Sequence, residues 1–355
     1  MMAASVPCTL QRKARFLSSE FMLPASAFLL LSYGRRERFP VQYVTLGRVP
    51  IMKNKDFVSI CDWSSEELSE TLSVAIAVKA DPLKFSHRLE GKALAMIFEK
   101  PSLRTRVSFD VGIHQLGGFS LCLTKAEINL GKRETVSDVA KNLERMVQGI
   151  MIRTFSHENV KEMAQFASIP VINGLTDFSH PCQAMADYMT LLELKGELRK
   201  LKVAYIGDGN NVAHSLIYAA VRFGVHLAVA TPEGYEPDPT VLKWARENTG
   251  SAGGKLEMLR NPVEAVTGAD VIYTDVWTSM GLESEAAKRR QIFKEYQVNE
   301  ALAQHAKPDY IFMHCLPAHR GEEVSDSVID STHSVVFQQA ENRLHAQKAI
   351  LLTLM

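Results

Sequence analysis

Short apolar runs alternate with amphipathic stretches along the chain from Met52 onward. The pair Ser64 and Glu67 forms the pattern of a capping box, which predicts the start of a helix. Further along, apolar runs of strand length are each followed by a stretch with helical spacing. This order predicts a parallel sheet with helices on both faces. The elements expected in this half are strands at Ala93–Phe98, Phe119–Leu123, Ile150–Arg153 and Pro170–Ile172, and helices at Ser102–Leu116, Glu134–Val147 and Asn159–Phe166.

The same pattern restarts after a long helix expected over Pro181–Leu194. The sequence therefore predicts an α/β fold of two doubly wound parallel-sheet domains joined by helices. We expect the first domain over residues 52–195, the second over 196–335, and a C-terminal helical segment, 336–355, that returns to the first domain. The elements expected in this half are strands at Lys202–Ile206, His226–Ala230, Val271–Thr274 and Tyr310–His314, and helices at Asn211–Phe223, Pro239–Asn248 and Ala340–Leu354.

Composition places the chain among ordinary globular proteins. Its 355 residues are 46% hydrophobic and 23% charged, which argues against wholesale disorder. Forty basic residues balance forty acidic ones, so no overall field favours nucleic acid or a membrane as a partner. The five cysteines are scattered and form no CxxC pair, so we expect no metal site and a reducing, cytoplasmic compartment.

The first 51 residues differ from the rest in charge. They contain seven Lys/Arg against two Asp/Glu, and their apolar run Phe21–Tyr33 is too short to span a bilayer. This segment has three interpretations: an organelle-targeting peptide, a secretion signal, or sequence ahead of a true start at Met52. The last is favoured because the periodic pattern begins just after Met52. In each case we expect residues 1–51 to lie outside the fold.

The strongest chemical signal follows the strand Ala93–Phe98. Free backbone N–H groups at the helix start make an anion site, and the nearby arginines and hydroxyls add donors for phosphate oxygens. The alternative is a plain capped helix with solvated arginines. The residues of this signal are Ser102, Leu103, Arg104, Thr105 and Arg106.

Two further segments stand where ligands collect in open α/β sheets, beyond the carboxyl ends of strands. Arg153 ends a strand, while His180 and Gln183 open the long helix. They could face the same anion, although a single histidine such as His180 is more often a capping or packing residue.

The turn Gly207–Asn211 resembles a dinucleotide-binding fingerprint. However, Val212 occupies the place of the third glycine, and a GxG pair alone is weak evidence. A nucleotide-binding oxidoreductase or regulator therefore stays open as an alternative.

Two later strand ends carry candidate chemistry. The carboxylate of Asp275 and the loop through Gly281 suit a small cationic or zwitterionic ligand, unless Asp275 only caps a helix. Cys315 could be a nucleophile or a packing residue. Because neighbouring strand residues face opposite sides, a dyad of Cys315 with His314 is not expected.

Taken together, six segments resemble the aspartate/ornithine carbamoyltransferase family, and its ornithine-specific members in particular. They occur in the family's order, and the resemblance covers essentially Met52–Met355. The segments are FEKPSLRTRVSF, HPCQAMAD, GDGNN, DVWTSMG, MHCLP and AENR.

The resemblance implies a role for each matching residue. Arg104, His180, Asp275 and Cys315 would be catalytic, with Asp275 and Cys315 relaying a proton. No cofactor is implied, and the substrates would be carbamoyl phosphate and L-ornithine. The family is built on a trimer, in which a neighbour's loop, here containing Asn129, reaches each site. Carbamoyl phosphate would be held by Ser102, Leu103, Arg104, Thr105, Arg153, His180, Gln183, Cys315, Leu316 and Arg343, and ornithine by Asn211, Asp275, Ser279 and Met280.

One position departs from the family pattern. Leu103 stands where ornithine enzymes often have threonine, and an apolar residue there also occurs in enzymes for acylated ornithine. The implied reaction is carbamoyl transfer to the ornithine δ-amine, which gives citrulline for arginine biosynthesis. Acylated ornithine, putrescine and aspartate stay open as alternative acceptors.

Overall fold

The computed structural model describes Val49, Met52, residues 55–250 and residues 253–355. The fold below is that of the unit formed by residues 41–355. Most of the N-terminal segment expected to lie outside the fold falls outside the described residues. Val49 is among the described residues, and it contradicts that expectation, because its side chain is 7% exposed and belongs to the hydrophobic core. The folded part of the chain therefore extends at least to this residue.

The first sheet consists of four parallel strands in the order β2-β1-β3-β4. From β1 the chain moves first to one side and then to the other, so the strand order reverses between β1 and β3. The flanking helices are α1 (Ser65–Ala80), α2 (Leu103–Gln115), α3 (Lys125–Ile128), α4 (Val136–Leu143) and α5 (His157–Phe166), and the strands are β1 (Ala93–Phe98), β2 (Phe119–Thr124), β3 (Gly149–Arg153) and β4 (Val171–Leu175).

The second sheet has five parallel strands in the order β7-β6-β5-β8-β9, with its reversal between β5 and β8. Its strands are β5 (Lys202–Ile206), β6 (His226–Ala230), β7 (Lys255–Leu259), β8 (Val271–Thr274) and β9 (Ile311–His314). Its helices are α7 (Asn211–Phe223), α8 (Pro239–Asn248), α9 (Pro262–Val266), α10 (Ala286–Ile292), α11 (Glu300–Ala303) and α12 (Asp326–Ile329). The predicted fold class, two doubly wound parallel sheets, is confirmed.

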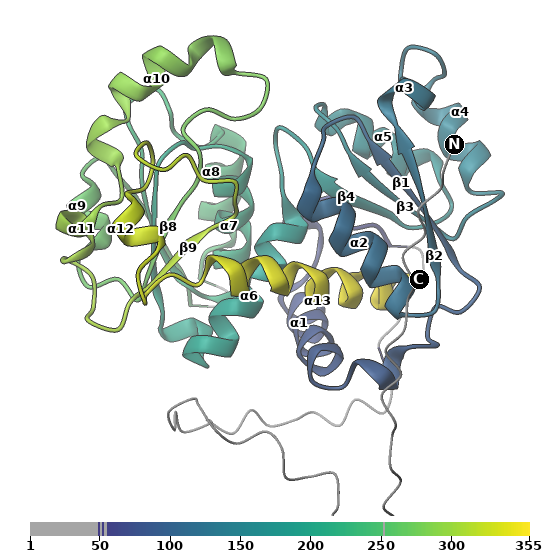
Figure 1. Cartoon of the computed structure of the whole chain (residues 1–355), viewed down its shortest axis with the longest axis horizontal. Helices are drawn as coiled ribbons and strands as arrows, with labels where there is room; N and C mark the ends of the chain where they lie inside the picture. The colour runs from purple at the N-terminus through teal and green to yellow at the C-terminus, as the bar shows by residue number, and fades with distance from the viewer. Residues whose placement is uncertain (1–48, 50–51, 53–54, 251–252) are drawn as a thin grey trace, which may run out of the picture. The chain divides into compact units, whose positions relative to one another are not determined.

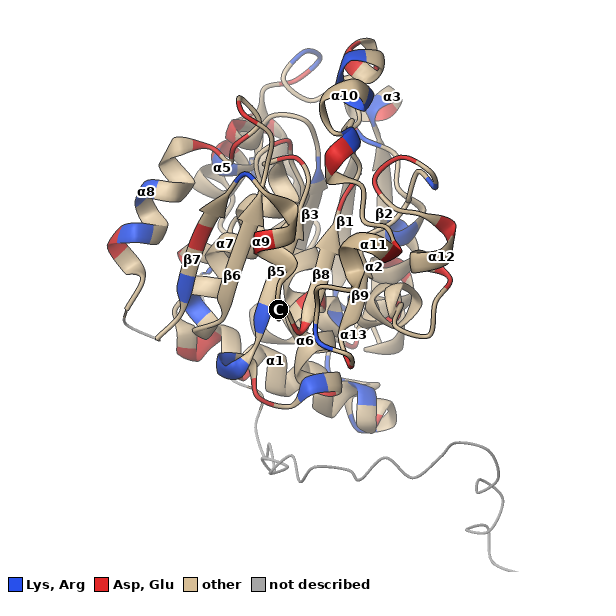
Figure 2. Ribbon diagram, turned by 90° about the vertical axis from the view of Figure 1, so that its left-hand side faces the viewer, with Lys and Arg blue, Asp and Glu red and all other residues tan. Residues whose placement is uncertain are grey.

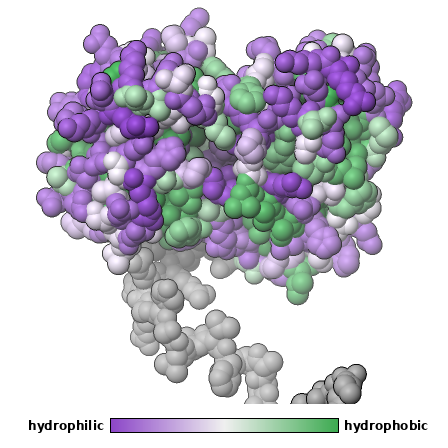
Figure 3. Space-filling model, turned by 45° about the horizontal axis from the view of Figure 1, so that its top comes forward, coloured by the Kyte–Doolittle hydropathy of each residue, from purple (hydrophilic) through white to green (hydrophobic). Residues whose placement is uncertain are grey.

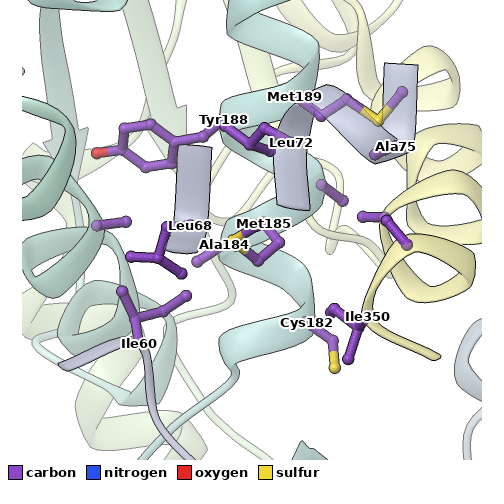
Figure 4. Close-up of a cluster of buried hydrophobic side chains, with 14 of the residues drawn as sticks. Ile60, Leu68, Leu72, Ala75, Cys182, Ala184, Met185, Tyr188, Met189 and Ile350 are labelled. Atoms are coloured by element: carbon purple, nitrogen blue, oxygen red, sulfur yellow. The ribbon is translucent and has the colours of Figure 1, made fainter. Parts of the chain in front are cut away.

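Two long helices, α6 (Pro181–Lys195) and α13 (Val336–Leu354), lie between the sheets (Figure 1). Residues 181–191 of α6 are all buried, because α1, α13 and α7 surround the helix. Figure 4 shows side chains of α6, such as Met185 and Tyr188, packed among Leu68 and Leu72 of α1 and Ile350 of α13. This packing holds each sheet in position against the two central helices.

The edge strand β7 was absent from the sequence prediction. Its residues alternate polar and apolar over only the first four of five positions and follow the glycine pair at 253–254, so the strand signal is weak. Figure 2 shows basic and acidic residues on this edge, where Lys255 pairs with Glu257 at 2.6 Å. Helix α13 also begins at Val336, four residues earlier than expected. No helix among the described residues is long and apolar enough to cross a membrane.

Candidate active site

A cavity of about 440 Å³ lies where the reversal points of the two sheets face each other. It is visible as a hollow between the two lobes in Figure 3. Thr105 and Gln183, also expected in the site, are buried rather than part of its wall. Expected residues that line the cavity are Ser102, Leu103, Arg104, Arg153, His180, Asn211, Asp275, Ser279, Met280, Cys315, Leu316 and Arg343.

The start of α2 forms one wall of the cavity. Ser102 is the N-cap, and its Oγ accepts a hydrogen bond of 3.2 Å from the backbone N–H of Thr105. The Thr105 hydroxyl, in turn, accepts from the guanidinium of Arg343 at 2.7 Å and from that of Arg153 at 3.4 Å. A single buried threonine therefore joins α2, β3 and α13 at the cavity.

Three guanidinium groups gather at this wall without a neutralising carboxylate in their hydrogen bonds. Arg104 donates to the backbone oxygen of Leu316 at 2.5 Å, and Arg153 and Arg343 donate to Thr105. Within the described part of the chain, the Nε atoms of all three are buried and lack a hydrogen-bond partner. Burial and the charges of Arg343 and Arg104 lower the pKa of Arg153 to about 9. Such a cluster is suited to a multiply charged anion, which would supply the missing acceptors.

His180 stands against the same cluster. Burial, followed by the charges of Arg343, Arg153 and Arg104, lowers the pKa of His180 well below 6.5. The imidazole is therefore neutral at physiological pH and acts as a hydrogen-bonding group rather than a fourth cation.

The opposite wall carries a buried carboxylate. Asp275, 5% exposed, follows β8 and accepts from the Cys315 thiol at 3.0 Å and from Asn210 Nδ2 at 2.8 Å. Asn210 is oriented by its own N-cap bond, in which Oδ1 accepts from the N–H of Val212 at 2.9 Å. No helix begins at Asp275, so the helix-cap interpretation of this residue is wrong.

Cys315 is a thiol donor rather than a thiolate. Burial, and then the neighbouring charge of Asp275, raises the pKa of Cys315 well above 9. His314 does not act as its base, because the His314 Nδ1 accepts from the N–H of Leu316 at 2.8 Å and Nε2 lies 3.2 Å from Glu323. The structure thus agrees with the expectation that Cys315 and His314 form no dyad.

The glycine turn after β5 does not offer room for a pyrophosphate. A Cβ on Gly209 would lie 2.2 Å from the backbone nitrogen of Pro237, so the chain itself fills the space above the turn. Asp208 pairs with Arg289 at 2.9 Å. The turn serves packing and the capping of α7, and the dinucleotide interpretation is wrong.

Three side chains at the cavity were missed by sequence reasoning. Asn210 holds Asp275, whereas the resemblance pointed only to its neighbour Asn211, which donates to the backbone oxygen of Thr176 at 2.6 Å. Lys100, 3% exposed, pairs with Asp177 and lines the cavity, as does His319. Lys100 stands two residues after the end of β1, and that position was the available signal.

Fold and site together define a two-sheet α/β protein that holds an anionic ligand against a cationic or zwitterionic one. Residues 55–193 match the family model of the aspartate/ornithine carbamoyltransferase carbamoyl-P binding domain. Residues 199–354 match that of the Asp/Orn binding domain of the same family. The chain therefore belongs to the aspartate/ornithine carbamoyltransferase family.

The alignments with similar proteins span nearly the full length of those proteins. The ornithine carbamoyltransferase of Thermococcus kodakarensis is 58% identical over 86% of this chain and 97% of that protein. The anabolic ornithine carbamoyltransferase of Pyrococcus furiosus is 56% identical, again over 86% of this chain and 97% of its own length. A solved structure of ornithine carbamoyltransferase from Pyrococcus furiosus aligns with a TM-score of 0.84, at 56% identity, over 86% of this chain and 99% of that one.

The arginine cluster generates a first prediction. We expect Arg104→Ala to weaken the binding of carbamoyl phosphate about 10- to 100-fold, as lost hydrogen bonds to a charged group would. Arg106→Ala, an exposed position on the same helix, is the matched control and should stay close to the parent. Isothermal titration measures both, and equal affinities in the two variants would contradict the assignment of Arg104 to the anion.

Proposed function

We propose that this chain transfers the carbamoyl group of carbamoyl phosphate to the δ-amine of L-ornithine, giving L-citrulline and phosphate in arginine biosynthesis. One observation carries the proposal: a cluster of three guanidinium groups and the carboxylate of Asp275 face one cavity. The donor is a dianion and the acceptor carries an α-ammonium, so each wall complements one substrate. The high identity to ornithine carbamoyltransferases supports this choice of acceptor.

The division of labour follows the two sheets. We assign donor binding to residues 52–195, acceptor binding to 196–335, and a joining role to the C-terminal segment 336–355, whose Arg343 reaches the donor wall. The matched family models support this division. The donor ligands we assign are Ser102, Leu103 through its backbone N–H, Arg104, Thr105, Arg153, His180, Gln183, Cys315, the carbonyl of Leu316, and Arg343.

The chemistry follows from these charges. Attack by the amine builds negative charge on the carbonyl oxygen and on the departing phosphate, and fixed donors such as Arg104 and His180 stabilise it. The attacking amine must be neutral, although a lysine-like amine has a pKa of about 10.4 in water. Desolvation in the closed cavity lowers that pKa, and Asp275 with the Cys315 thiol relays the proton. Asn211, Ser279 and Met280 complete the acceptor pocket.

We also propose that the enzyme is a homotrimer. Three apolar side chains form an exposed stripe at helical spacing along α2: Leu103 (76% exposed), Val107 (50%) and Val111 (38%). Phe119 and Leu121 extend the apolar surface onto β2, the edge strand of the first sheet. Asn129 ends the short helix α3, which follows β2, so a second copy docked here would have the loop with Asn129 close to its interface.

The compartment is a further part of the proposal. We place the enzyme in the cytoplasm, in keeping with its scattered cysteines, of which the four in the described part of the chain are free. The alternative is import into an organelle through residues 1–51. Fractionation of cells that express the full chain distinguishes the two.

The reaction itself is tested by an acceptor panel. We expect ornithine to exceed acetylornithine, putrescine and aspartate by at least about 100-fold in kcat/KM, because each analogue leaves buried polar groups unpaired. Carbamoyl product is measured with all four amines under the same conditions. A higher value for any of the other three would replace ornithine as the substrate.

Asp275 provides the sharpest variant. We expect Asp275→Asn to lower kcat/KM for ornithine about 10- to 100-fold through loss of a charge-assisted contact, while carbamoyl phosphate affinity changes little. Asp270→Asn is the matched control: Asp270 is also buried but pairs with Lys307 at the opposite end of β8. Unchanged ornithine kinetics in Asp275→Asn would remove this residue from the acceptor site.

The trimer is tested on the α2 stripe. We expect Val107→Glu to shift the chain from trimer toward monomer and to reduce turnover, because a buried unpaired carboxylate opposes association. Met258→Glu is the control, at an exposed apolar position on the second sheet. Light scattering after size-exclusion chromatography gives the masses, and a Val107→Glu trimer would place the interface elsewhere.

A further inference from the structure

A buried carboxylate, Asp187, connects three parts of the fold immediately behind the cavity. It lies on α6 and is 1% exposed. Its Oδ1 accepts from Gln183 Nε2 at 2.8 Å and from Gln339 Nε2 on α13 at 2.7 Å. Its Oδ2 accepts from the hydroxyl of Tyr273 on β8 at 3.1 Å. Asp187 takes no part in the chemistry described above.

The orientation of the Gln183 amide follows from this carboxylate. An ionised carboxylate has only acceptor atoms, so it binds the amide nitrogen of Gln183 and leaves the amide oxygen on the other side. Gln183 Oε1 is buried and has no hydrogen-bond partner in the part of the chain that the structure describes. Gln183 lies in the first turn of α6, three residues after the N-cap His180, which lines the cavity, and its backbone N–H donates to the His180 oxygen at 3.1 Å.

Leaving the buried Gln183 Oε1 without a donor costs free energy, and a ligand that supplies an N–H group removes this cost. The carbamoyl group carries such an N–H, whereas the acetyl group of acetyl phosphate has a methyl group at the same position. The two donors are otherwise alike in size and in their phosphate.

We propose that Asp187 is a positioning residue that makes the site select an acyl phosphate bearing an NH2 group, because it locks the Gln183 amide with its oxygen toward the ligand. This deepens the proposed function and rests on its donor site. In Asp187→Asn the new side-chain amide can donate a hydrogen bond as well as accept one. The Gln183 amide is then free to rotate by half a turn, so that its oxygen accepts from this N–H within the protein. Selection for the NH2 group would then be lost while the fold is kept.

The test compares carbamoyl phosphate with acetyl phosphate in direct binding to the full chain. Burial raises the pKa of Asp187 to about 7 against the three donors, so titration at about pH 8 keeps the carboxylate ionised. We expect the parent to prefer carbamoyl phosphate about 5- to 100-fold, the range set by one unpaired buried polar group. In Asp187→Asn the preference should fall to about twofold or less.

Tyr273→Phe is the matched control, because it removes one hydrogen bond from the same carboxylate, and one from Gln339, while both amides keep their bonds to Asp187. It should keep the full carbamoyl preference, whatever its effect on thermal stability. A general structural role for Asp187 would instead reduce the affinities of both donors in parallel, in both variants.

A second variant keeps the test decisive if Asp187→Asn does not fold. Gln183→Met keeps the side-chain volume but removes the acceptor, so it too should lose the preference. A folded Asp187→Asn or Gln183→Met that retains the parent preference overturns the proposal. This experiment measures only the binding of the carbamoyl or acetyl phosphate. Its result therefore does not depend on which amine is the second substrate, and the panel of four amines tests that question separately.

Discussion

Three arginine side chains share one buried corner of this protein, and like charges there repel one another. Arg104, Arg153 and Arg343 come from α2, β3 and α13, and two of them meet at the hydroxyl of Thr105. Nothing local to those segments favours such an arrangement. It is held by the packing of α6 and α13, whose buried faces stabilise the structure enough to offset the repulsion. A dianionic substrate neutralises these charges. The repulsion between the guanidinium groups therefore opposes folding but favours substrate binding.

The loop after β9 joins the two halves of the site. Leu316 presents its carbonyl to Arg104, while Cys315 donates to Asp275. His314 orders the loop from below, since its two ring nitrogens engage the N–H of Leu316 and the carboxylate of Glu323. The donor wall and the acceptor wall therefore contact neighbouring residues of one segment. This arrangement suits a reaction in which two substrates must be held at bonding distance.

Asp187 is the centre of a buried hydrogen-bond network behind the cavity. Through Gln339, whose Oε1 accepts from the N–H of His314 at 2.9 Å, the same carboxylate that orients Gln183 also braces the loop after β9. Buried polar networks of this kind specify one arrangement when every member is satisfied. Here one member, Gln183 Oε1, has no hydrogen-bond partner within the described part of the chain, as expected of a group that waits for a ligand.

The strands buried on both faces, the helix starts with their caps, and the phosphate-type signal at Ser102–Arg106 could be predicted from the sequence. These are local: periodicity and capping depend on neighbouring residues in the chain. The sequence did not determine the charged edge strand β7, whose five residues carry little pattern, nor the start of α13. Arg343 entered only through the family resemblance, and Asn210 was passed over for Asn211, whereas Cys315 was a candidate from its place at a strand end. Tertiary structure alone decided which side chains meet, because the contacts of Arg343 with Thr105, of Cys315 with Asp275 and of Asp187 with Gln339 join residues far apart in the chain. Such contacts follow from how helices and sheets pack, and no local pattern records them.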